Sequence, residues 1–120
     1  MTVTNVEGFS ASGVASGIKS NKELDLALVA TEDRKPVSAA GVFTSNKMTA
    51  APVLITIKHL QATGGFASAV VLNSGNANAA TGTQGLIDAE RMCQLTAQDL
   101  GCESSEVLVC STGWIGYPLP

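Results

Sequence analysis

One short segment of the chain, CSTG at residues 110–113, has the residue types that an acyl-transfer site needs. The Thr112 hydroxyl can donate a hydrogen bond, and Gly113 lets a backbone N–H approach a ligand oxygen with no side chain in the way. Two such donors can form an oxyanion hole, which stabilises the negative oxygen that develops during acyl transfer. An ordinary Ser/Thr/Gly turn uses the same residue types and is the more common structure, so the residues alone leave both interpretations open.

The other nucleophile, base and metal candidates indicate structural roles. His59 is the single histidine, and no partner that would orient its ring is recognisable, so we interpret it as a partly exposed structural residue. Cys93, Cys102 and Cys110 form no CxxC pair and are interpreted as reduced, mostly buried thiols. The acidic residues, Glu90 among them, are typical of solvated surface. The sequence therefore predicts no metal site.

The composition is that of a folded chain without nucleic-acid or membrane partners. Of the 120 residues, 45% are hydrophobic and 14% are charged, which is enough apolar material for a core. The net charge is -3 and the seven basic residues are scattered, which argues against binding to nucleic acid. No apolar run approaches the ~20 residues of a membrane span, and residues 1–10 lack the pattern of a signal peptide. We therefore expect a cytoplasmic protein.

The first half of the chain predicts short strands and one ambiguous segment. Residues 7–17 (EGFSASGVASG) indicate an extended hairpin or loop. Residues 24–30 and 38–44 are short and apolar, and the charged turn between them predicts that they pair as strands. In residues 53–60 the β-branched side chains favour a strand, whereas Pro52 favours a short helix, which we prefer.

The second half predicts a strand, a polar loop, a helix and a strand. Residues 67–72 (ASAVVL) predict a buried strand, and residues 73–82 (NSGNANAATG) predict a loop outside the core that hydrogen bonds must order. Residues 106–110 predict a last buried strand. Between the polar loop and this last strand, the sequence predicts a helix that ends at Gly101. Its apolar residues recur at helical spacing: Leu86, Ala89, Cys93, Ala97 and Leu100.

This order predicts a single α+β domain of layered architecture over residues 1–120. The last residues, 117–120 (YPLP), follow a loop and complete no further element. We therefore expect the domain to be incomplete.

Five segments, in order along nearly the whole chain, carry a family resemblance. They are GFSASGVASGIK (8–19), LDLALV (24–29), AAGVFTSNKMTAAPV (39–53), VVLNSGNANAATG (70–82) and VLVCSTGWIGYPLP (107–120). Together they resemble the N-terminal part of the α chain of the ArgJ family of ornithine and glutamate N-acetyltransferases. The asparagine-rich segment and the CSTG segment are its most specific parts.

The resemblance implies an α+β fold of the ArgJ/DmpA-like, N-terminal-nucleophile type. In that family a precursor cleaves itself before a threonine, which then begins the β chain and acts as the nucleophile, with its own α-amino group as general base. The acetyl group passes from N2-acetylornithine to this threonine and then to glutamate. The resemblance implies no cofactor. Some members also accept acetyl-CoA, which leaves that thioester open as a substrate.

Residue by residue, Thr112 and Gly113 match the family's oxyanion-hole pair. Trp114 departs from the smaller aliphatic residue usual there, so we expect different packing beside Gly113. The nucleophilic threonine and the self-cleavage motif match no residue of this chain. We therefore expect the 120 residues to be inactive alone, and to act in a hetero-oligomer with the remainder of the α chain and the β chain of the same precursor.

Two other functions remain open on the sequence. An N-terminal-nucleophile amidohydrolase would use the same oxyanion pair, because amide hydrolysis passes through a similar tetrahedral intermediate. A noncatalytic module that binds a small ligand would use the asparagine-rich segment as its binding surface.

Overall fold

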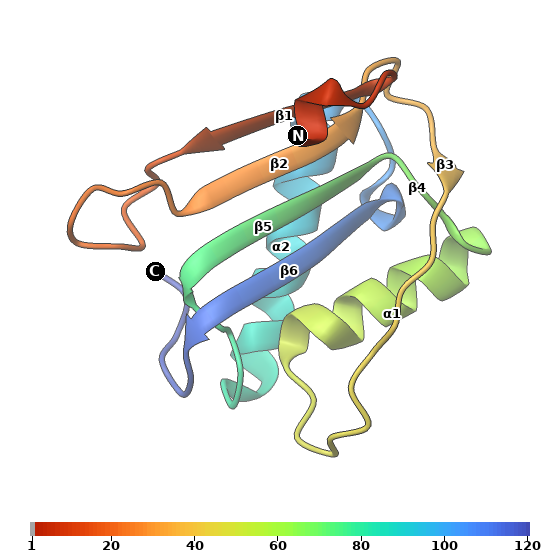
Figure 1. The fold of residues 1–120 in the computed structure, drawn as a ribbon. Coiled ribbons are helices and arrows are strands. Elements are labelled where there is room, and N and C mark those ends of the chain that lie inside the picture. The colour runs from red at the N-terminus through yellow and green to blue at the C-terminus, as the bar shows by residue number, and fades with distance from the viewer. Residues whose placement is uncertain (1) are drawn as a thin grey trace.

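The computed structural model describes residues 2–120, which form a sheet of four strands and two α-helices (Figure 1). The order in the sheet is β1-β2-β5-β6. β2 is antiparallel to β1 and to β5, whereas β5 and β6 are parallel. These strands are β1 (Phe9–Val14), β2 (Leu26–Thr31), β5 (Ala69–Asn76) and β6 (Val107–Trp114). The smaller elements are the paired strands β3 (Val37–Ser38) and β4 (Phe66–Ala67), and the 3-10 turns η1 (Val3–Asn5) and η2 (Ser104–Glu106).

Both predicted helices are present. Helix α1 (Ala51–Thr63) begins with Pro52 in its first turn, where the missing N–H costs no hydrogen bond, and ends at Gly64 with a φ of 67°. Helix α2 (Gly82–Leu100) ends at Gly101 with a φ of 73°, as predicted. Neither helix, nor any other in residues 2–120, is long and apolar enough to span a membrane.

The core lies between the sheet and the two helices. In Figure 1, α2 crosses behind the sheet and α1 lies beside the β6 edge. Most of the core side chains are small, which lets the layers approach closely: Ala30, Ala51, Ile55, Ala69, Val71, Ala89, Cys93, Ala97, Val107 and Val109. Neither α-helix covers the opposite face of the sheet, where Cys110 and Thr112 are exposed.

The predicted pairing of residues 24–30 with residues 38–44 is wrong. β2 pairs instead with β1, from Phe9 opposite Thr31, and with β5 on its other side. Of the second segment, only Ser38 lies in a strand, at the end of β3, and Val42 is fully exposed. Two long partners already occupy both edges of β2, so no edge remains for the second segment.

Of residues 73–82, predicted as a loop outside the core, only residues 77–81 form a loop, and the predicted exclusion from the core is wrong. β5 continues to Asn76, and Asn73, Asn76 and Asn78 are all buried. Their amides satisfy the backbone: Asn73 Nδ2 donates to the Asn76 carbonyl at 2.8 Å, and Asn78 Nδ2 donates to the Gly85 carbonyl at 2.8 Å. The expected hydrogen bonds therefore form in the interior of the molecule.

Candidate functional site

Thr112 and Gly113 lie in strand β6, not in the loop predicted after it. The strand continues past its buried part to Trp114, and both residues are exposed at that end. Thr112 lines a cavity of about 340 Å³ together with Leu24, Ala27, Leu72, Ser74 and Cys110. The hydroxyl-bearing residue is thus beside a mainly apolar cleft on the sheet face that the helices leave open.

Gly113 occupies a position that no other residue fits. Its φ is 133°, and a Cβ built there would lie 2.5 Å from the Asn76 amide nitrogen and closer still to the Gly75 carbonyl carbon. The register of β5 against β6 shifts at this point, because Asn76 pairs with both Thr112 and Trp114. Close backbone approach, and not only access for a ligand, therefore requires glycine at residue 113.

A buried carboxylate borders the same cleft. Asp25 lines the cavity with Thr112, and its carboxylate accepts hydrogen bonds from the loop between β1 and β2. The N–H of Lys19 and then that of Ser16 lower the pKa of this carboxyl far below its usual range, although burial acts in the opposite direction. Asp25 therefore carries a negative charge at neutral pH. The sequence interpretation missed this residue.

Two buried polar atoms beside the cleft have no hydrogen-bond partner within residues 2–120. They are Asn73 Oδ1 and Ser111 Oγ, and both residues line the cavity. Buried polar atoms are usually paired with protein or with ordered water. Ordered water is therefore the expected partner of these two atoms.

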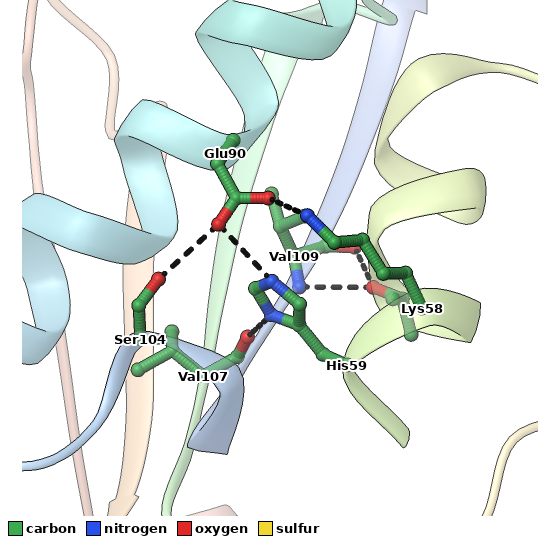
Figure 2. A network of polar contacts seen from close by, with 7 residues as sticks. Lys58, His59, Glu90, Ser104, Val107 and Val109 are labelled. Atoms are coloured by element: carbon green, nitrogen blue, oxygen red, sulfur yellow. Dashed lines mark hydrogen bonds and ion pairs between the residues drawn. The ribbon is translucent and has the colours of Figure 1, made fainter. Parts of the chain in front are cut away.

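His59 is buried and oriented, so its prediction as partly exposed and without a partner is wrong. Figure 2 shows its ring between α1, α2 and β6. Nδ1 donates to the Val107 carbonyl at 2.8 Å, since a carbonyl can only accept, and Nε2 lies 3.3 Å from Glu90 Oε1. Glu90 also accepts from Lys58 at 2.9 Å and from the Ser104 hydroxyl at 3.4 Å (Figure 2). None of these side chains lines the cleft beside Thr112.

Glu90 differs from the solvated carboxylate that the sequence predicts. Partial burial alone would raise its pKa, but the hydrogen bond and charge of Lys58 and the charge of His59 outweigh burial and lower it. The side chain is 24% exposed. Glu90 is therefore part of the contact between the two helices and β6, not of free surface.

The three cysteines lie in different environments, all as free thiols. Cys93 is fully buried in the core, and burial raises its pKa to about 12. Cys102 is half-buried. Cys110 is exposed on the open face of the sheet, so its prediction as a buried thiol is wrong. Among residues 2–120 there is no group of three side chains that could hold a metal ion.

The ArgJ family model matches residues 10–120 of the chain. The arginine biosynthesis bifunctional protein ArgJ 1 of Clostridium acetobutylicum is 51% identical over 118 residues, which cover 98% of this chain and 28% of that protein. ArgJ of Streptomyces avermitilis is 51% identical over 120 residues, all of this chain and 30% of that protein. The chain therefore belongs to the ArgJ family.

Solved structures agree with this membership. ArgJ of Bacillus halodurans superposes with a TM-score of 0.92 at 42% identity, over all of this chain and 61% of that one. The ornithine acetyltransferase of Mycobacterium tuberculosis, solved with ornithine, superposes with a TM-score of 0.92 at 49% identity, over 98% of this chain and 62% of that one. The predicted α+β fold is confirmed. The chain spans under a third of the length of the C. acetobutylicum and S. avermitilis relatives.

Proposed function

We propose that this chain is the N-terminal part of the α chain of an N-acetyltransferase of arginine biosynthesis. The complete protein would move acetyl from N2-acetylornithine to glutamate, through an acetyl group held on a threonine outside these residues. The single observation that supports this most is the place of Thr112 and Gly113: both are exposed at the end of β6, and Thr112 lines the cleft on the open sheet face. Ornithine bound to a 49% identical relative agrees with this substrate class.

In this proposal Thr112 and Gly113 form the oxyanion hole. The threonine nucleophile attacks the acetyl carbonyl, and the oxygen becomes negative as the tetrahedral intermediate forms. The Thr112 hydroxyl and the Gly113 N–H donate to that oxygen in both half-reactions, and the close contact with Gly75 holds the pair rigid. Donors that are already in place cost no reorganisation during the reaction.

The proposed partner is the remainder of the same precursor. Large apolar side chains are exposed around the end of β6 and the β1–β2 loop: Leu24 at 67%, Trp114 at 70%, Ile115 at 67% and Tyr117 at 57%. Such a patch is typical of a surface that another chain segment covers. We propose that residues 1–120 are one incomplete domain, that the rest of the α chain and the β chain complete it as a hetero-oligomer, and that the assembly is cytoplasmic.

The fate of the acetyl group tests the proposal. The complete precursor, allowed to cleave itself, is incubated with labelled N2-acetylornithine with and without glutamate. A transferase produces labelled N-acetylglutamate only when glutamate is present, and without glutamate it releases no more than one ornithine per active site. Release of labelled acetate at the same rate in both reactions would instead identify an amidohydrolase. The 120 residues alone should produce neither, and acetyl transfer by them would contradict the proposed division of the site.

A further inference from the structure

The loop between β1 and β2 is built around one buried carboxylate. Asp25 is only 3% exposed. Its Oδ1 accepts the Ser16 N–H at 2.6 Å and the Ser16 hydroxyl at 2.7 Å. Its Oδ2 accepts the N–H of Gly17 at 3.2 Å and that of Lys19 at 2.8 Å. Three backbone N–H groups and one hydroxyl from residues 16–19 thus point at one anion, and the loop has no other anchor of this kind.

Asp25 also connects this loop to the end of β5 through its backbone. Its N–H donates to the Val14 carbonyl at 3.1 Å, and its carbonyl accepts the Ser74 N–H at 2.8 Å. Ser74 immediately precedes Gly75, the residue against which Gly113 packs. The same residue therefore holds both the loop and the strand that the loop covers.

The loop held by Asp25 packs directly on Gly75. A Cβ at residue 75 would lie 3.0 Å from Ile18 Cγ2 and 3.1 Å from Lys19 Cγ, so the loop leaves room there only for glycine. On the other side of Gly75 lies Gly113, where the backbones are closer still: a Cβ at residue 113 would lie 2.6 Å from the Gly75 carbonyl oxygen. Gly75 is thus enclosed between the Asp25 loop and the glycine of the proposed oxyanion pair.

We propose that Asp25 is a positioning residue for acetyl transfer: through the loop and Gly75 it fixes the backbone of Gly113 in the geometry that receives the negative oxygen. The inference rests on the proposed role of Thr112 and Gly113. A neutral amide cannot replace the carboxylate, because an asparagine would turn an NH₂ group toward N–H donors that need an acceptor. Asp25 does not contact the reacting atoms, and its effect is confined to placement.

The test uses the complete, self-cleaved protein with Asp25→Asn. The matched control is Asp33→Asn, because exposed Asp33 also caps a turn through its carboxylate, by accepting the Lys35 N–H at 3.1 Å, beyond the opposite end of β2. Active sites are counted as acetyl groups bound per enzyme molecule, and kcat per active site and KM are then measured. Displacement of the Gly113 backbone in Asp25→Asn is expected to lower kcat about ten- to a hundredfold with little change in KM. Partial unfolding would instead reduce the number of active sites.

A second variant and a second measurement keep the inference testable if Asp25→Asn folds poorly. Ile18→Ala leaves all four bonds to Asp25 in place but uncovers Gly75, and should lower kcat in the same way by a smaller factor. The NMR chemical shift of the Gly113 amide, which reports the position of its backbone, should move in Asp25→Asn and stay unchanged in Asp33→Asn.

The outcomes separate the two proposals. If the wild-type protein transfers no acetyl group, the proposed function fails, and the chemical shift of the Gly113 amide still decides whether Asp25 controls that residue. If the wild type is active but Asp25→Asn and Ile18→Ala keep its kcat per active site within about twofold, the positioning role is overturned. An unchanged Gly113 amide shift in Asp25→Asn overturns it as well.

Discussion

One hydroxyl group pairs with both backbone polar groups of Val109 on β6, and its removal gives a sharp prediction. β6 is the last strand of the sheet, so its outer backbone groups have no neighbouring strand within the described residues. Thr56, on α1, donates its hydroxyl to the Val109 carbonyl at 2.8 Å and accepts the Val109 N–H at 3.0 Å. Val109 is 1% exposed, so water cannot replace either bond.

Thr56→Val keeps the shape of the side chain and removes both hydrogen bonds. Each buried backbone group left without a partner costs about 1–3 kcal/mol, and the added methyl group returns about 0.8 kcal/mol. The expected loss in the free energy of unfolding, for two such groups less the methyl contribution, is therefore about 1–5 kcal/mol. Thr56→Ser is the matched control, because it keeps the hydroxyl and loses one methyl group, at a cost of about 1 kcal/mol.

Two measurements on the purified protein check this prediction. Urea denaturation gives the free energy of unfolding, and NMR follows the exchange of the Val109 amide. Thr56→Val should lower the unfolding midpoint well below that of Thr56→Ser and should accelerate exchange at Val109. If valine costs no more than serine, the hydroxyl does not secure the edge of the sheet and the reasoning is refuted.

Three further predictions concern other parts of the molecule. The pKa of Glu90 is lowered in the fold, so its carboxylate stabilises the protein above the ordinary value of 4.5, and this contribution is lost as the pH falls. Glu90→Gln should therefore flatten the acid limb of a plot of unfolding free energy against pH. Identical acid limbs in the two proteins would contradict the network in Figure 2. Iodoacetamide at neutral pH should modify half-buried Cys102 in the folded protein and buried Cys93 only after urea unfolding, as mass spectrometry of the labelled peptides would show; early labelling of Cys93 would mean that the core is open. Gly113→Ala should lower the thermal midpoint as well as activity, because its Cβ meets the β5 backbone, whereas an unchanged midpoint would show that the two strands can separate at no cost.

Local patterns predict the elements whose cause is local. The apolar period from Leu86 to Leu100 and the stop at Gly101 are sufficient for α2, and Pro52 correctly favours a helix at α1. The pairing partner of β2 has no such local cause, because the apolar pattern of residues 24–30 is compatible with pairing to any other strand. Pairing is decided by the whole sheet, and so the sequence prediction chose the nearest segment wrongly.

The polar residues were the hardest to predict. His59 contacts Glu90, 31 residues away in sequence, and Val107, 48 residues away, only because α1, α2 and β6 meet in the fold. The asparagines of β5 have the composition of a loop, and only tertiary packing shows that their amides satisfy buried backbone. Asp25 offered a weak local signal, since it follows the small, glycine-bearing segment SGIK within nine residues and such a segment can direct N–H groups at one carboxylate.

The rate of acetyl transfer by variants of Thr112 in the complete protein tests the central claim most directly. Thr112→Val removes the hydroxyl at the exposed end of β6 with little change in shape, and Thr112→Ser keeps it. If the hydroxyl stabilises the oxyanion, Thr112→Val lowers kcat about a hundredfold or more at nearly unchanged KM, while Thr112→Ser retains most of the wild-type kcat. A Thr112→Val enzyme that works at close to the wild-type rate would contradict the assignment.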